Sequence, residues 1–159
     1  MTAFPAAMDR DGNRQVLPTP LPFLASKRIT FDGNTSGAIG DKDGALATFP
    51  IFTVTGDVLV YVFGICKTDL SGAGTLEVGV TNNTAILLAQ IANTTTLDQD
   101  ENYIDATPGA GKGEAPIYHP ISGGLDIEGK TTTADITAGV IDFYVFWRPL
   151  SSDGNVVAA

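Results

Sequence analysis

The sequence predicts an all-β protein: an antiparallel β-sandwich of jelly-roll-like form with an extended, proline-rich N-terminal arm. Short apolar stretches alternate with Gly, Asn and Asp turns along residues 25–159. No segment of ten or more residues repeats its apolar positions with the helical period. Four of the nine prolines lie within residues 1–24, where they exclude a central strand. We therefore expect an arm over residues 1–24 and a sandwich domain over residues 25–159.

The arm combines prolines with apolar residues. Residues 17–22 read Leu-Pro-Thr-Pro-Leu-Pro, and proline restricts both its own φ and the backbone of the preceding residue. An extended, polyproline-like backbone is therefore expected. Two interpretations stay open, a strap packed over its own domain and an arm that docks on a neighbouring subunit. The candidate partner-binding residues are Phe4, Val16, Leu17, Pro18, Pro20, Leu21, Pro22 and Phe23.

Eight stretches of the domain have the composition of short strands. They are residues 27–31, 45–55, 57–66, 74–81, 84–92, 117–121, 125–128 and 140–148. In the second stretch, period-two alternation would place Ala47, Phe49, Ile51 and Thr53 on one face. Pro50 lies inside that stretch and indicates an edge strand or a bulge, because proline donates no ladder hydrogen bond. Strand positions alone leave the choice between a jelly roll and another sandwich topology open.

The middle of the domain predicts a hairpin followed by a long loop. Residues 74–81 alternate apolar and polar side chains, as in a half-buried antiparallel strand. Asn82 and Asn83 then favour a two-residue turn, because Asn tolerates positive φ. Residues 94–112 are rich in Asp and Gly, and we expect a long loop there that can hold one helical turn.

Two of the expected strands, residues 58–65 and 140–147, are apolar on both faces. The second places Ile141, Phe143, Val145 and Trp147 on one face and Val140, Tyr144 and Phe146 on the other. The outer face of an antiparallel sandwich is ordinarily polar. We therefore expect the outer faces of these strands to be covered by the arm, by a loop or by another subunit.

The charge balance argues against nucleic-acid and membrane-surface binding. Nine basic residues stand against eighteen acidic ones, which gives a net charge of −9, and only Lys27 and Arg28 are adjacent among the basic residues. Proteins that bind nucleic acid or anionic lipid usually cluster Lys and Arg on one surface. An acidic surface instead favours solubility. Residues 1–14 show no basic segment followed by an apolar one, so we expect no secretory signal, and we expect synthesis in a reducing cytoplasm.

Catalytic and metal-binding motifs are weak in this sequence. His119 is the single histidine and Cys66 the single cysteine, so the usual four-ligand zinc sets are excluded. We interpret Cys66 as a buried small residue and His119 as a structural or surface residue. Residues 109–113, Gly-Ala-Gly-Lys-Gly, fail the phosphate-loop pattern because Ala106 replaces its first glycine and Gly113 its Ser or Thr. We expect no catalytic residue and no cofactor.

Asp and Glu side chains are the remaining candidate ligands for a metal ion. Asp9 and Asp41 each begin an Asp-x-Asp-Gly sequence, but the glutamate that a calcium loop needs at its twelfth position is Pro20 in one and Phe52 in the other. The group of Asp98, Asp100, Glu101 and Asp105 is interpreted as a solvated loop, with a loop-locking cation as the alternative. We therefore predict no metal site.

Three segments resemble small structural proteins encoded among the virion genes of tailed bacteriophages. They are residues 52–70 (FTVTGDVLVYVFGICKTDL), residues 103–108 (YIDATP) and the C-terminal FYVFWRPLSSDGNVVAA. The resemblance implies a capsid-associated role and no particular functional residues. It fits a β domain with an arm and no catalytic motif. The leading hypothesis is a capsid decoration, or cement, protein on the virion surface, a homo-oligomer with a trimer favoured, that binds the major capsid protein.

Two alternatives stay open beside this hypothesis. A neck, tail or fibre-base component of the same particle would differ from a decoration protein mainly in its copy number. A carbohydrate-binding module for host adsorption would need an exposed aromatic side chain, for which Tyr103 and Tyr118 are the candidates. An enzyme is not expected, because any Ser/His/Asp or Cys/His set would have to use His119.

Overall fold

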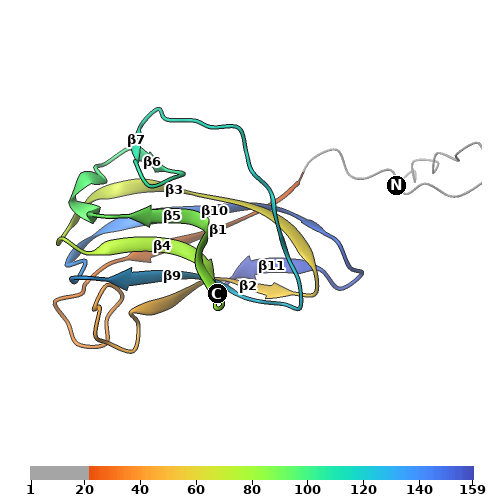
Figure 1. Ribbon diagram of the computed structural model, residues 1–159, viewed down its shortest axis with the longest axis horizontal. Coiled ribbons are helices and arrows are strands. Elements are labelled where there is room, and N and C mark those ends of the chain that lie inside the picture. Colours follow the sequence, from red (N-terminus) through yellow and green to blue (C-terminus); the bar gives the residue numbers. More distant parts are fainter. Residues whose placement is uncertain (1–21) are drawn as a thin grey trace, which may run out of the picture.

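The computed structural model describes residues 22–159 and shows two antiparallel β-sheets stacked face to face (Figure 1). One sheet has the order β1-β10-β3-β6-β7, with β8 also paired to β3, and the other has the order β11-β2-β9-β4-β5. The strands are β1 (Phe23–Thr30), β2 (Thr48–Thr55), β3 (Val58–Ser71), β4 (Thr75–Val80), β5 (Asn83–Ile91), β6 (Glu101–Tyr103), β7 (Gly109–Ala110), β8 (His119–Ile121), β9 (Ile127–Thr132), β10 (Ala138–Pro149) and β11 (Asn155–Ala158), with one 3-10 turn, η1 (Thr94–Thr96). The predicted all-β sandwich is confirmed.

The strand pairing is that of a jelly roll. Four antiparallel pairs are nested one inside the next along the chain, namely β4 with β5, β3 with β6, β2 with β9 and β1 with β10. The pairs β4–β5 and β2–β9 lie in one sheet and the pairs β3–β6 and β1–β10 in the other. A long hairpin wound around a barrel axis gives this arrangement. The strand order therefore settles the topology that strand positions alone left open.

The strand β2 carries the bulge that Pro50 indicates. The register with β9 shifts between Pro50 and Phe52, and Ile51 and Phe52 are both fully buried. The expected alternation is therefore wrong beyond Ile51, because the bulge turns Thr53 outward and Val54 inward. The edge position that Pro50 also indicates is met locally, because β9 pairs with residues 48–52 of β2 whereas β11 pairs only with residues 52–55.

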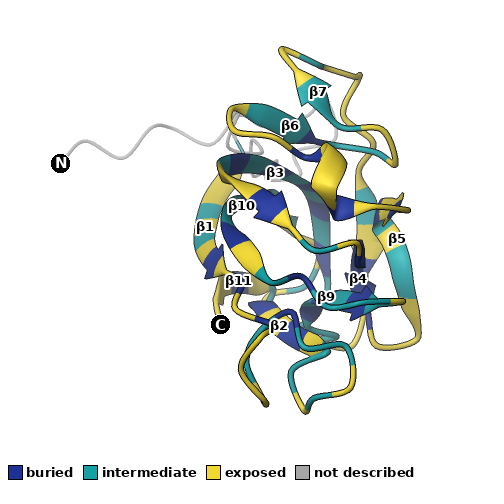
Figure 2. Cartoon of the chain, turned by 90° about the vertical axis from the view of Figure 1, so that its left-hand side faces the viewer, coloured by how far each residue is buried: buried dark blue, intermediate teal, exposed yellow. Residues whose placement is uncertain are grey.

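The core lies between the two sheets, where β3 and β10 supply one wall. Val58, Val60 and Val62 of β3 are buried beside Phe143 and Val145 of β10. Figure 2 looks at the sandwich from one end, and its buried segments line the space between the sheets. The alternation predicted for residues 140–147 is confirmed, since Trp147 is only 8% exposed.

Several elements differ from their predicted bounds. The strand β1 begins at Phe23, so Phe23 and Leu24, which were assigned to the arm, are the first residues of a strand. The hairpin turn lies at Thr81 and Asn82, one residue earlier than expected. The loop expected over residues 94–112 includes η1 and the short strands β6 and β7, and β11 was not predicted.

The strand β4 is buried on both faces rather than on one. On its polar face, Glu77 accepts hydrogen bonds from the side chains of Thr84 and Gln90 (Nε2, 2.9 Å) in β5, the neighbouring strand of the same sheet. Within residues 22–159, the model has no helix with the length and apolarity required to cross a bilayer.

Candidate interaction surface

The outer face of the first sheet carries rows of aromatic residues. In β10 and β3, Phe146 lies opposite Tyr61 and Tyr144 opposite Phe63. In β1, Leu24 lies opposite Phe146 and extends that row to the sheet edge. The alternate residues Val145 and Trp147 point into the core, so the aromatic side chains point away from it. This is the outer apolar face that the two doubly apolar strands predict.

The aromatic rings of this face form one connected cluster. Phe63 stacks on Tyr144 with ring centroids 5.2 Å apart and on Phe146 at 6.0 Å. Tyr61 stacks on Phe63 at 5.7 Å and meets the ring of Tyr118 at 6.0 Å. We call these five residues, Tyr61, Phe63, Tyr118, Tyr144 and Phe146, the aromatic face. Aromatic pairs at these separations stabilise one another beyond the area that they bury.

The aromatic face is only partly covered. The segment that precedes β8 brings Pro116 and Tyr118 over one side of it, and Tyr118 itself is 40% exposed. The other four rings are half-buried, and Leu24 at the end of their row is 57% exposed. The expectation of cover is therefore met in part by a loop of the same chain, and an apolar area is left open.

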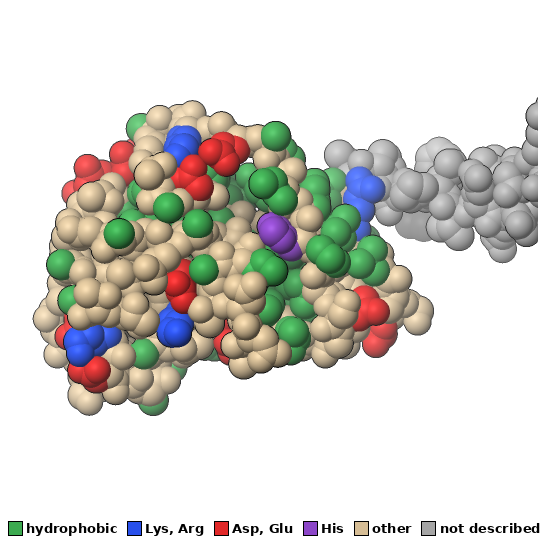
Figure 3. All heavy atoms as spheres, in the orientation of Figure 1, with side chains coloured by type: hydrophobic (Ala, Val, Ile, Leu, Met, Phe, Trp, Pro, Cys, Tyr) green, Lys and Arg blue, Asp and Glu red, His purple; other side chains and the backbone are tan. Residues whose placement is uncertain are grey.

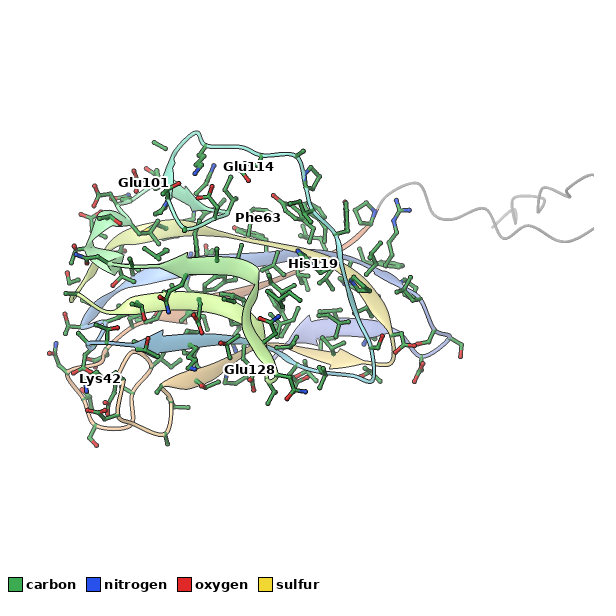
Figure 4. The ribbon with its side chains drawn as sticks, in the orientation of Figure 1. Lys42, Phe63, Glu101, Glu114, His119 and Glu128 are labelled. Carbon is green, nitrogen blue, oxygen red and sulfur yellow. The ribbon has the colours of Figure 1, made fainter. Side chains whose placement is uncertain are left out.

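Two hollows lie along this face and share Tyr61 and Phe146. The first has a volume of about 330 Å³ and is lined by Pro22, Tyr61, Pro116, Tyr118 and Phe146. The second, of about 320 Å³, is lined by Tyr61, Phe63, Ile65, Asn102, Ile104, Lys112, Gly113, Glu114 and Phe146. Figure 4 shows Phe63 below the segment that carries Glu114. We call the two hollows together the aromatic groove.

An ion pair fixes the loop at the polar end of the aromatic groove. Lys112 Nζ donates to both carboxylate oxygens of Asp105, at 2.7 and 2.6 Å, and to the carbonyl of Thr107 at 2.6 Å. The hydrogen bond from Lys112 lowers the pKa of Asp105 to about 2. Asn102 Nδ2 donates to the carbonyl of Lys112 at 2.8 Å, so the loop is held against β6. The ion pair and this hydrogen bond therefore hold the wall of the groove in place.

A second ion pair lies at the end of the aromatic face that is farther from Leu24. Arg28 Nε and Nη2 donate to the two carboxylate oxygens of Asp142, at 2.7 and 2.8 Å. The two residues lie opposite each other in β1 and β10. The hydrogen bond from Arg28 lowers the pKa of Asp142. The aromatic face is thus apolar near Leu24 and charged two rows further along the strands.

A third hollow of about 280 Å³ contains His119 and opens between β3 and β5; it shares Tyr61 with both hollows of the groove, and Ile104 and Glu114 with the second of them. Its lining is largely apolar, with Ile86, Leu87, Ile104 and Ile117 among its residues, and it also includes Asp105 and Glu114. Hydrophobic side chains gather around His119 in the space-filling view (Figure 3). No Ser or Cys side chain is among the residues that line the hollow, so it does not bring together the Ser/His or Cys/His pair that the sequence analysis considered.

The remaining candidates for chemistry are structural. Cys66 is fully buried and burial raises the pKa of its thiol to about 11, which agrees with its interpretation as a small core residue. Over residues 22–159, no group of three or more His, Cys, Asp or Glu is placed to hold a metal ion. Tyr103, one of the two candidates for an exposed sugar-stacking ring, is fully buried, so this interpretation of Tyr103 is wrong.

The predicted partner-binding residues fall into two groups. Phe4, Val16, Leu17, Pro18, Pro20 and Leu21 lie outside the described residues. Pro22 lines the aromatic groove, and Phe23 stacks on Trp147 at 4.7 Å while 48% of it stays exposed. The aromatic face itself was not among the predicted residues, although the doubly apolar strands were the signal for it.

No family model, curated protein or solved structure matches this chain.

Proposed function

We propose that this protein is a structural component of a tailed-bacteriophage virion, specifically a capsid decoration protein that binds the major capsid protein lattice. The observation that supports it best is the aromatic groove, which is partly exposed and begins at Pro22, where the proline-rich segment joins the domain. Tyr and Phe are enriched at the centres of protein interfaces. A rigid apolar surface next to a proline-rich arm is suited to assembly rather than to catalysis.

The physical chemistry of such a role is consistent with the composition. A decoration protein binds a repeating lattice, so several modest contacts per oligomer combine into stable attachment. We propose a homo-oligomer, with a trimer favoured because a lattice offers local three-fold axes. The net charge of −9 would keep the exterior soluble and away from nucleic acid.

The jelly-roll fold is compatible with this role. Jelly rolls are found among both viral capsid and lectin domains, and a fold of this kind hosts many unrelated functions. The first hollow of the groove is lined by Pro22, Tyr61, Pro116, Tyr118 and Phe146. Sugar sites pair an aromatic ring with several polar side chains. The first hollow lacks such side chains, and in the second hollow the ammonium group of Lys112 is already bound by Asp105 and Thr107, so the groove favours a protein partner over a glycan.

The test is an add-back experiment with capsids from the phage that encodes this chain, prepared without the protein. The purified full chain is expected to sediment with these capsids in hundreds of copies per particle. Capsids that already carry the protein serve as the control and are expected to take up none. Absence of binding to the depleted capsids would refute the proposal. A copy number of about six to twelve would instead identify a ring in the neck or tail.

A further inference from the structure

We propose that the aromatic groove of one copy binds the proline-rich segment, residues 17–21, of a second copy of this chain. The proposal deepens the structural role above and rests on it only for the association of several copies. It names the surface that receives the arm and the conformation in which the arm is bound.

The lining of the groove suits a proline-rich ligand. Grooves that recognise proline-rich segments are built from parallel aromatic rings, between which the prolines of a polyproline II helix insert. Tyr61 and Phe146 line both hollows, and Tyr118 and Pro116 form the far wall of the first. The segment itself has Pro at positions 18, 20 and 22. Because proline fixes φ, a segment of this sequence has less backbone entropy to lose on docking.

The dimensions of segment and groove agree. Along β3 the groove extends from Tyr61 to Ile65, a rise of about 13 Å at ~3.3 Å per strand residue. Five residues of polyproline II, likewise counted over four rises, extend about 12 Å at ~3.1 Å per residue. The length of the groove and the length of residues 17–21 therefore agree to within one residue.

The course of β1 explains why the occupant is a second copy. Traced back along β1, the chain moves from the level of Asp142, opposite Arg28, to the level of Trp147, opposite Phe23. The groove extends in the reverse direction, from Pro22 towards Ile65, which lies opposite Asp142. An arm that filled its own groove would have to reverse direction at Pro22.

Such a reversal conflicts with the sequence of the arm. Each proline pushes the residue before it towards extended backbone, and the alternation at Pro18, Pro20 and Pro22 restricts Leu17, Thr19 and Leu21 in this way. A tight turn over this segment is therefore disfavoured. The arm of each copy would bind the groove of the next copy, which is a head-to-tail contact. When such contacts close on themselves, the copies form a ring, and a ring of three copies is the trimer favoured above.

The test uses the full chain and compares three classes of variant by light scattering. The first groove variant is Tyr61→Ala. Because loss of this half-buried ring could destabilise the domain, the second groove variant is Tyr118→Ala, at the exposed rim. The arm variant is Pro18→Ala/Pro20→Ala. The control is Ile117→Ala, because Ile117 is 67% exposed and next to Tyr118 but lines only the hollow of His119. Wild type and control are expected to have a mass several times 16.5 kDa, and both other classes the mass of one chain.

A mixing experiment separates exchange between copies from docking within one copy. A groove variant still has an intact arm, and the arm variant still has an intact groove. Native mass spectrometry of their mixture is expected to show a complex with one copy of each, which neither forms alone. A wild-type chain that is monomeric at every concentration, groove variants that keep the wild-type mass, or a mixture without the mixed complex would each overturn the proposal. Capsid binding without the mixed complex would leave the virion role standing and this inference refuted.

Discussion

The rings of Phe63 and Tyr144 stack with their centroids 5.2 Å apart and their planes 15° from parallel, on the outer face of the sheet. They belong to β3 and β10, the two longest strands, whose other faces form the core. One sheet thus has two apolar sides, and only one of them is covered by the second sheet. The proposed contact between copies follows from this asymmetry.

Trp147 is expected to be a main contributor to the stability of the domain. It is 8% exposed and stacks on Phe23, so Trp147→Ala removes a large buried ring and should cost about 3–5 kcal/mol of unfolding free energy. Urea denaturation followed by far-UV circular dichroism measures this loss. Phe23→Ala is the control and should cost less, because Phe23 is 48% exposed. Equal losses for the two variants would contradict the assignment.

Gly129 leaves space for a core ring, and a methyl group there should destabilise the fold. A Cβ at Gly129 would lie 2.4 Å from two ring carbons of Phe49, which lies opposite it in β2. Gly129→Ala is therefore expected to cost about 1–3 kcal/mol in urea denaturation, as overpacked cores do. Gly113→Ala has no neighbour within 4 Å and should change stability by less than about 0.5 kcal/mol. A neutral Gly129→Ala would refute this account of the β2–β9 pair.

Tyr103 ties β6 to the opposite sheet through its hydroxyl. The hydroxyl lies 2.9 Å from the carbonyls of Leu76 and Ala89, and the side chain is fully buried. Tyr103→Phe keeps the ring but leaves buried acceptors without this donor, which should cost about 1–3 kcal/mol. The exposed Tyr118 gives the matched control, and Tyr118→Phe should change the denaturation midpoint little. A midpoint shift of the same size in both would contradict the structural role of Tyr103.

The ion pair of Asp105 and Lys112 predicts a pH-dependent contribution to stability. The pKa of Asp105 is lowered from 3.8 to about 2, so the fold favours the charged carboxylate. Its contribution is complete above about pH 5 and is lost as the pH falls towards 2. Asp105→Asn should therefore be less stable than wild type at pH 6, and the difference should shrink at pH 3 and below in urea denaturation.

The partner residue gives the control for this pH dependence. Lys112→Gln removes the largest of the hydrogen bonds that lower the pKa of Asp105, so the effect of Asp105→Asn made in that background should change less with pH than it does in the wild type. A difference between wild type and Asp105→Asn that stays constant from pH 6 to pH 3 would contradict the assignment.

The fold class could be predicted because strand patterns and turn residues are local signals. The alternation in residues 140–147 separated the two faces of β10, and the burial of Trp147 shows which of them faces the core. Other features depend on partners far away in the sequence. The bulge of β2 at Pro50 and Phe52 is set by pairing with β9, and the four residues of β11 form a strand only because β2 offers an open edge.

The candidate surface was only partly predictable for the same reason. Residues 58–65 and 140–147 indicated an outer apolar face, but only the pairing of β3 with β10 brings Tyr61, Phe63, Tyr144 and Phe146 into one cluster. Tyr118 reaches that cluster through a loop more than fifty residues further along the chain than Tyr61. Tyr103 looked available in the sequence and is buried, because β6 pairs with β3.

The central claim is that copies of this chain associate through the arm and the aromatic groove. The most direct measurement is the mass in solution, by light scattering over a range of concentrations, of the full chain and of a chain that begins at Pro22. Residues 22–159 keep every contact described above, so the shorter chain should give the same far-UV circular dichroism spectrum. We predict a mass several times 16.5 kDa for the full chain and that of a single copy for the shorter one. Equal masses for the two chains would contradict the account.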